Sequence, residues 1–249
     1  MARRAISTIT GGPARSVLGI HVFHCPAEIG GVGGQDVVGI VAKLSECIAS
    51  RGGNIRSVDV FVPENKQEFY SRSEFVFDPT YWPRDVVDND FIKLSKLFSA
   101  EKSIVRVPDL DPKYKIVILA SKQEHCLVDL LYKWQEGRLP VDISCVISNH
   151  QRAPNTHVIR FLERHGIPYH YLPTSAGNKR EAEILELAED TDFLVLARYM
   201  QVERVSHRDT LQSFVQKSEN LEKQCLVQAI KSYCELRVLP YQENKTLVF

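Results

Sequence analysis

The second half of the chain alternates between apolar runs and segments of helical period. The runs show no in/out alternation, which is typical of strands buried on both faces of a parallel sheet. They are KIVILAS (115–121), DISCVIS (142–148), IPYHYL (167–172) and DFLVLA (192–197). The segments between them place apolar residues three and four positions apart, as amphipathic helices do. This pattern predicts an open parallel α/β sheet, which binds ligands beyond the carboxyl ends of its strands.

The loops after these strands are therefore the candidate binding region. They cover residues 121–125, 148–154, 173–178 and 198–201. Without further information, most polar side chains in these loops are expected to be ordinary solvent-exposed loop residues. His125 and His157 lie on predicted helices, where surface or capping roles are expected.

Residues 18–107 predict a separate unit with a different pattern. Strand-like segments at 18–24, 54–62, 68–78 and 103–108 show rough alternation, and segments 36–53 and 91–99 have helical period. A βαββαβ order in about ninety residues is ferredoxin-like.

The chain from residue 202 onward changes character again. HRDTLQSFVQKSENLEKQCLVQAIKSYCEL (207–236) predicts a long helix with a break near Ser218. RVLPYQENKTLVF (237–249) predicts a terminal hairpin that turns at Gln242–Asn244.

Composition narrows the class of protein. The 249 residues carry 31 basic and 31 acidic side chains, so no electrostatic argument favours a nucleic acid partner. No apolar run approaches the roughly 20 residues of a membrane helix, so no membrane partner is expected. The six cysteines form no C-x-x-C pair, which favours reduced, buried thiols over disulfides or metal ligands.

Two segments near the N-terminus are open to more than one interpretation. Residues 1–17 contain Arg3, Arg4 and Arg15 with no acid, which is typical of a transit peptide, mitochondrial before plastid; the alternative is a disordered tail. AEIGGVGGQ (27–35) predicts a flexible insertion before a helix. A phosphate cradle is the alternative, although no Lys-Ser/Thr follows it.

Two stretches carry a resemblance to a known family. KIVILASKQEHCLVDLLYKWQEGRLPVDISCVISNH (115–150) and FLVLARYMQ (193–201) resemble formyltetrahydrofolate deformylase, a member of the formyltransferase superfamily. The resemblance implies an ACT regulatory domain at 18–107, through which the protein forms homo-oligomers, and a Rossmann-like formyltransferase domain at 113–249. It implies hydrolysis of 10-formyltetrahydrofolate to tetrahydrofolate and formate, with no metal or cofactor.

The same resemblance assigns substrate-binding residues. Asn149 and His150 match a polar loop at the mouth of the family's active site. A second group matches the stretch whose backbone holds the pterin: Leu196, Arg198, Tyr199, Met200 and Gln201.

The family's catalytic groups have no counterpart in this chain. Deformylation needs an oxyanion donor, a proton shuttle and a group that orients water. In the superfamily, an N-x-H-x-S loop supplies Asn and His, and a later loop supplies Asp. No N-x-H-x-S occurs here, and beyond Gln201 the only residues of these types are His207, Asp209, Asn220 and Asn244. The sequence thus predicts an internal deletion at the Gln201–Val202 join and no catalytic residue of its own.

Two alternatives to an impaired hydrolase stay open from the sequence. The chain could be a non-catalytic folate-binding or subunit-interaction variant. It could also fold poorly, because ending the sheet at DFLVLA (192–197) leaves a very apolar strand with an open edge that the final hairpin would have to cover.

Overall fold

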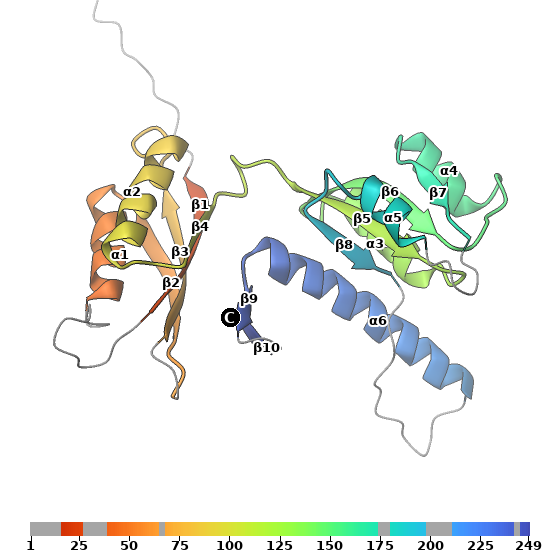
Figure 1. Cartoon of the computed structure of the whole chain (residues 1–249). Helices are drawn as coiled ribbons and strands as arrows, with labels where there is room; N and C mark the ends of the chain where they lie inside the picture. The colour runs from red at the N-terminus through yellow and green to blue at the C-terminus, as the bar shows by residue number, and fades with distance from the viewer. Residues whose placement is uncertain (1–15, 27–38, 65–67, 174–179, 198–210, 242–244) are drawn as a thin grey trace, which may run out of the picture. The chain divides into compact units, whose positions relative to one another are not determined.

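The computed structural model describes residues 16–26, 39–64, 68–173, 180–197, 211–241 and 245–249 (Figure 1). The chain forms two compact units. One comprises Met1–Pro112 together with Leu236–Phe249, and the other comprises Lys113–Glu235.

The first unit is a four-stranded antiparallel sheet with two helices on one face (Figure 1). Its strand order is β2-β3-β1-β4, which confirms the ferredoxin-like prediction. The elements are β1 (Val17–Pro26), α1 (Ile40–Ser50), β2 (Asn54–Phe61), β3 (Glu68–Phe77), α2 (Arg84–Leu97) and β4 (Lys102–Arg106). Helix α2 begins seven residues earlier than the helix predicted for 91–99, directly after Pro83, because its polar first turns conceal the apolar period.

Strand β1 is buried on both faces, and a different element covers each face. Phe23 and Cys25 pack toward the helices. Ile20 and Val22 pack on the other side against Leu239 and other residues of the C-terminal segment. That segment forms the predicted hairpin, β9 (Val238–Tyr241) paired antiparallel with β10 (Lys245–Val248).

The position of the hairpin differs from the predicted domain boundary. Residues 236–249 group with the first unit, whereas the predicted second domain extends over 113–249. The hairpin packs on the ferredoxin-like sheet, so the possibility that it covers the strand DFLVLA is not realised.

A histidine is buried at the centre of the first unit. His21 on β1 lies against Phe91, and its Nε2 is 3.0 Å from Ser103 Oγ. Burial lowers the pKa of His21 from 6.5 to about 3. Between pH 3 and pH 6.5, His21 is therefore protonated in the unfolded chain but not in the folded chain. The free energy of unfolding must fall as the pH drops from 6.5 toward 3.

We expect His21→Gln to flatten this dependence. The glutamine amide can still bond Ser103 but does not titrate in this range. Melting temperatures measured at pH steps from 7 down to 4 should decline less steeply in the variant than in the parent chain. Parallel slopes would show that His21 does not govern acid stability.

The second unit is a four-stranded sheet whose three strand pairs are all parallel, in the order β7-β6-β5-β8. Residues of α3, α4 and α6 pack against one face, and α5 packs against the other. The elements are β5 (Tyr114–Ala120), α3 (His125–Gln135), β6 (Val141–Ser148), α4 (His157–Arg164), β7 (Tyr169–Tyr171), α5 (Glu181–Leu187), β8 (Phe193–Leu196) and α6 (Leu211–Cys234). The predicted open parallel α/β sheet is confirmed.

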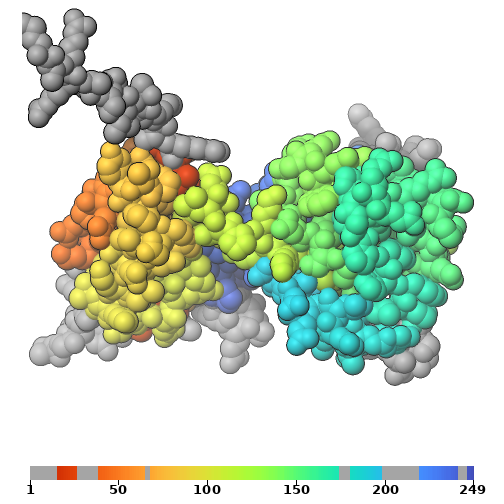
Figure 2. All heavy atoms as spheres, turned by 90° about the horizontal axis from the view of Figure 1, so that it is seen from above, coloured from red at the N-terminus to blue at the C-terminus, as the bar shows by residue number. Residues whose placement is uncertain are grey.

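The two edge strands depart from the predicted pattern. Strands β7 and β8 are not buried on both faces, because each is short and has one neighbour in the sheet. Leu194 and Leu196 of β8 are exposed. Figure 2 shows the segment 180–197, in cyan to light blue, at the surface of the second unit. Among the described residues, no strand pairs with the outer edge of β8.

Helix α6 runs without interruption through Ser218, so the predicted break there is wrong. Within the part of the chain that the structure covers, no helix combines the length and apolarity needed to cross a bilayer. All six cysteines are free thiols, and four of them are buried.

Candidate functional site

The carboxyl ends of the four parallel strands meet at one edge of the second unit. Ala120 at the end of β5 pairs with Ser148 of β6, which in turn pairs with Tyr171 of β7. Leu119 pairs with Leu196 of β8 on the other side. The loops that follow these strands therefore start side by side, as expected for the ligand-binding edge of an open α/β sheet.

A buried arginine joins two of these loops. Arg152, in the loop after β6, has a side chain only 3% exposed. Its Nη2 donates to the Ser121 carbonyl at 2.7 Å, and its Nη1 pairs with the Glu124 carboxylate, both in the loop after β5. The guanidinium thus holds the loop after β6 against the loop after β5. Sequence inspection missed this residue because its partners lie 28 and 31 positions earlier.

The predicted residues Asn149 and His150 lie at this edge, with exposed side chains. Their backbone is anchored: the His150 amide donates to Ser148 Oγ at 3.1 Å, and the Tyr169 hydroxyl donates to the His150 carbonyl at 2.6 Å. This anchoring leaves both side chains directed to solvent, where a ligand could meet them.

The predicted residue Leu196 lies at the same edge, on β8. One strand, β5, separates it from the strand that carries Asn149 and His150, so the backbones are roughly 10 Å apart. Leu196 is 52% exposed. The structure thus brings together three of the seven predicted binding residues. Arg198, Tyr199, Met200 and Gln201 lie outside the described residues, as do His207 and Asp209.

One of the two predicted surface histidines is placed differently. His157 is exposed, and its Nε2 lies 2.8 Å from the Tyr132 hydroxyl. His125 is only 13% exposed, and its Nε2 lies 2.5 Å from Glu222 on α6. The prediction of a surface or capping role for His125 is wrong, because the sequence gives no sign that α6 covers the start of α3.

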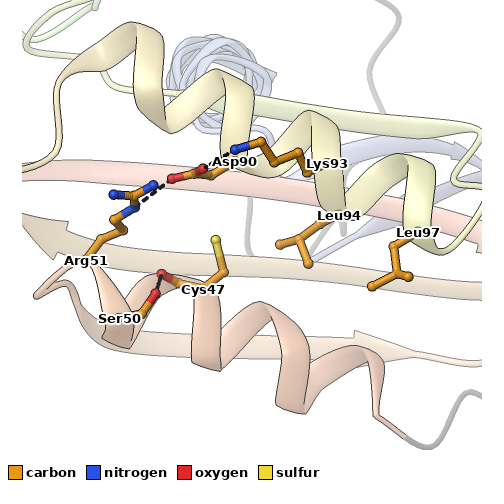
Figure 3. Close-up of a pocket in the computed structure, with 7 residues that line it drawn as sticks. All are labelled: Cys47, Ser50, Arg51, Asp90, Lys93, Leu94 and Leu97. Atoms are coloured by element: carbon orange, nitrogen blue, oxygen red, sulfur yellow. Dashed lines mark hydrogen bonds and ion pairs between the residues drawn. The ribbon is translucent and has the colours of Figure 1, made fainter.

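The first unit has a hollow of its own, between α1 and α2 (Figure 3). Asp90 accepts there from Arg51 Nε at 2.7 Å, Trp82 Nε1 at 3.2 Å and Lys93 Nζ at 3.3 Å. Burial raises the pKa of Asp90, but the hydrogen bonds from Arg51 and Lys93 outweigh it and hold the pKa below its ordinary value. Burial also raises the pKa of Cys47 to about 11. A fixed carboxylate and a protonated thiol suit a structural role.

The geometry defines a two-unit α/β protein, a ferredoxin-like module and a domain whose parallel strands end together at one edge. No model of a protein family matches the chain. Formyltetrahydrofolate deformylase 2, mitochondrial, of Arabidopsis thaliana is 56% identical over 93% of this chain and 87% of its own length. The deformylase of Bacillus subtilis is 27% identical over 86% of this chain and 91% of its own. A crystal structure of the Pseudomonas syringae deformylase superposes with a TM-score of 0.74, at 26% identity, over 97% of this chain and 96% of that one. The chain belongs to the formyltetrahydrofolate deformylase family.

Within the alignment with the Arabidopsis relative, this chain is shorter than the relative. The alignment extends over 293 positions, whereas 93% of 249 residues is about 232, so about 61 positions hold residues of the relative alone. This chain therefore lacks several dozen residues that its relative has inside the aligned region.

Proposed function

We propose that this chain has the fold that hydrolyses 10-formyltetrahydrofolate and binds the reduced folate. It releases formate far more slowly than complete relatives do. The binding part would lie at the carboxyl edge of the second unit, around Asn149, His150 and Leu196, and continue into Arg198–Gln201. The observation that carries the proposal is the combination of parallel strands that end together at one edge with a sequence that contains no N-x-H-x-S motif.

The missing length supports a deletion of the reactive centre. The surplus of about 61 aligned positions in the Arabidopsis relative suits a loss of several dozen residues at the Gln201–Val202 join. The open edge of β8 is where further strands would add to the sheet. Without the Asn, His and Asp that the family resemblance implies, the tetrahedral intermediate has no donor for its oxyanion and no proton shuttle.

A paired measurement of binding and turnover tests the proposal. Calorimetric titration should show that the purified chain binds tetrahydrofolate. A variant that carries both Asn149→Ala and His150→Ala should bind it more weakly. Glu136→Ala, on an exposed residue outside the four edge loops, is the matched control. Formate release from 10-formyltetrahydrofolate should be lower than that of the Arabidopsis enzyme by at least about 10²-fold. Absence of folate binding in a cooperatively melting chain would contradict the scaffold, and turnover equal to that enzyme's would contradict the loss of the reactive centre.

The non-catalytic variant has no specific support, because the relatives described above are all named as the enzyme.

The proposal also covers the role of the first unit and the location of the protein in the cell. The ferredoxin-like order supports an ACT-type regulatory role and homo-oligomerisation through the sheets. Sedimentation of the whole chain tests the second point, and a monomer would contradict it. The names of two Arabidopsis relatives support a mitochondrial location. A fluorescent fusion of the whole chain that stayed in the cytosol would contradict it.

A further inference from the structure

The start of α3 and the middle of α6 bring together three metal-ligating side chains. His125 and Cys126 come from the first turn of α3, and Glu222 comes from α6, nearly one hundred positions later. Their donor atoms all lie within 4.8 Å of one another. His125 Nε2 is 2.5 Å from Glu222 Oε2, and Cys126 Sγ is 3.8 Å from the same oxygen.

The fold holds these side chains in place from two sides. Cys126 is buried in the core cluster that also contains Val227 and Ile230 of α6. Glu222 lies five and eight positions before those residues, so it extends the buried stripe of α6 toward the start of the helix. His125 and Glu222 are 13% and 15% exposed. The cluster is thus preorganised and still reachable from solvent.

The donor set and its charge fit a zinc-class dication. Imidazole nitrogen, thiolate sulfur and carboxylate oxygen are the three ligand types that Zn²⁺ takes in proteins. A thiolate and a carboxylate with a neutral imidazole balance the two positive charges. A tetrahedral ion with bonds of about 2.0–2.3 Å needs a nitrogen–oxygen separation of roughly 3.4 Å and a sulfur–oxygen separation of roughly 3.6 Å. The second separation nearly exists already, and the first requires His125 and Glu222 to part by roughly 0.9 Å.

We propose that His125 Nε2, Cys126 Sγ and Glu222 form a binding site for a Zn²⁺-class transition metal ion that joins α3 to α6, with water as the fourth ligand. Glu219 acts as a positioning residue. Its Oε1 lies 3.9 Å from His125 Nδ1, on the far side of the ring from the metal. At this distance the carboxylate attracts the Nδ1–H electrostatically and favours the tautomer that leaves Nε2 free to bind; a carboxylate beside the second ring nitrogen is common around zinc histidines.

Without a metal ion, Glu222 Oε2 meets both other groups: it lies 2.5 Å from His125 Nε2 and accepts from the Cys126 thiol at 3.8 Å. Burial first, and then the charge of Glu222, raises the pKa of Cys126 to about 12. A dication between the thiol and the carboxylate would displace the thiol proton and take the thiolate and the carboxylate as ligands. The proposal departs from the sequence-based expectation that no cysteine binds metal.

The proposal is tested by metal titration of the whole chain, made without a histidine tag and stripped with EDTA. Titration with Zn²⁺ should give one bound ion per chain. Titration with Co²⁺ should produce a thiolate-to-cobalt charge-transfer absorption. Cys126→Ser should abolish that absorption, Glu222→Gln should weaken Zn²⁺ binding at least about tenfold, and Glu219→Gln should weaken it about 10- to 100-fold.

Cys225→Ser is the matched control, because Cys225 lies on the same helix but is exposed. It should retain the stoichiometry, the affinity and the charge-transfer absorption. Circular dichroism of each variant separates loss of the site from loss of the fold, and the conservative Glu222→Gln change gives a result even if Cys126→Ser does not fold. Absence of a bound ion, or equal binding by the parent chain and the folded variants, would overturn the proposal.

Discussion

Inserting the missing family segment between Gln201 and Val202 is expected to raise formate release by on the order of 10²–10⁴-fold. The parent chain keeps the carboxyl edge with Asn149 and His150 but has no N-x-H-x-S motif. The inserted segment, taken from the Arabidopsis relative, would restore the oxyanion donor and the proton shuttle beside that edge. The measurement is kcat/KM for 10-formyltetrahydrofolate, followed through formate.

A second insertion variant separates chemistry from folding. It carries the same segment with the histidine of N-x-H-x-S changed to alanine. This variant should gain the same stability, because the new strands would cover Leu194 and Leu196 on β8 in both variants. It should not gain the turnover. If both insertions raised kcat/KM equally, or if neither did while both melted cooperatively, the proposed deletion of the reactive centre would be contradicted.

Glu74→Ala is expected to destabilise the first unit by about 3 kcal/mol, at the lower end of the range for breaking a buried ion pair. Glu74 Oε1 lies 2.7 Å from Nη2 of Arg72, whose side chain is fully buried, and 3.0 Å from Nη2 of Arg237 beside the hairpin. The carboxylate thus joins β3 to the C-terminal segment across the face that Ile20 and Leu239 fill. Removing it takes the carboxylate partner from a guanidinium that water does not reach.

The chain contains a reporter for this experiment. Its two tryptophans lie in different units, Trp82 in the first and Trp134 in the second. In a Trp134→Phe background, the fluorescence of Trp82 during urea unfolding reports the first unit alone. Glu46→Ala is the control, because Glu46 pairs with Lys43 on an exposed helix face and should leave the unfolding midpoint close to that of the parent chain. Equal midpoints for the two variants would show that Glu74 does not hold the hairpin.

The sequence predicted most of the fold because the dominant signals are local. The apolar runs of β5 and β6 predict their strands, and helices such as α4 show a clear 3.6-residue period. The same signals failed where burial is incomplete. Strands β7 and β8 were expected to be covered on both faces, but their edge positions leave residues such as Leu196 exposed.

Features that depend on distant contacts were not accessible from the sequence. Leu239 of the hairpin packs on Ile20 of β1, and no local pattern indicates which unit a terminal hairpin joins. Arg152 and the His125–Glu222 pair likewise depend on partners 28 and 97 positions away. Of the predicted binding residues, only Asn149, His150 and Leu196 lie among the described residues, so only these could be placed in the fold.

The central claim is that the chain retains the folate scaffold and lacks the reactive centre. The most direct measurement is a single-turnover experiment in which the purified chain, in excess, is mixed with 10-formyltetrahydrofolate and the formate formed per substrate is counted. Over the time in which the Arabidopsis enzyme converts all of its substrate, this account predicts bound folate and only a small fraction of an equivalent of formate, because turnover is slower by at least about 10²-fold. One equivalent of formate in that time would contradict it and would mean that residues such as His150 or His207 perform the chemistry.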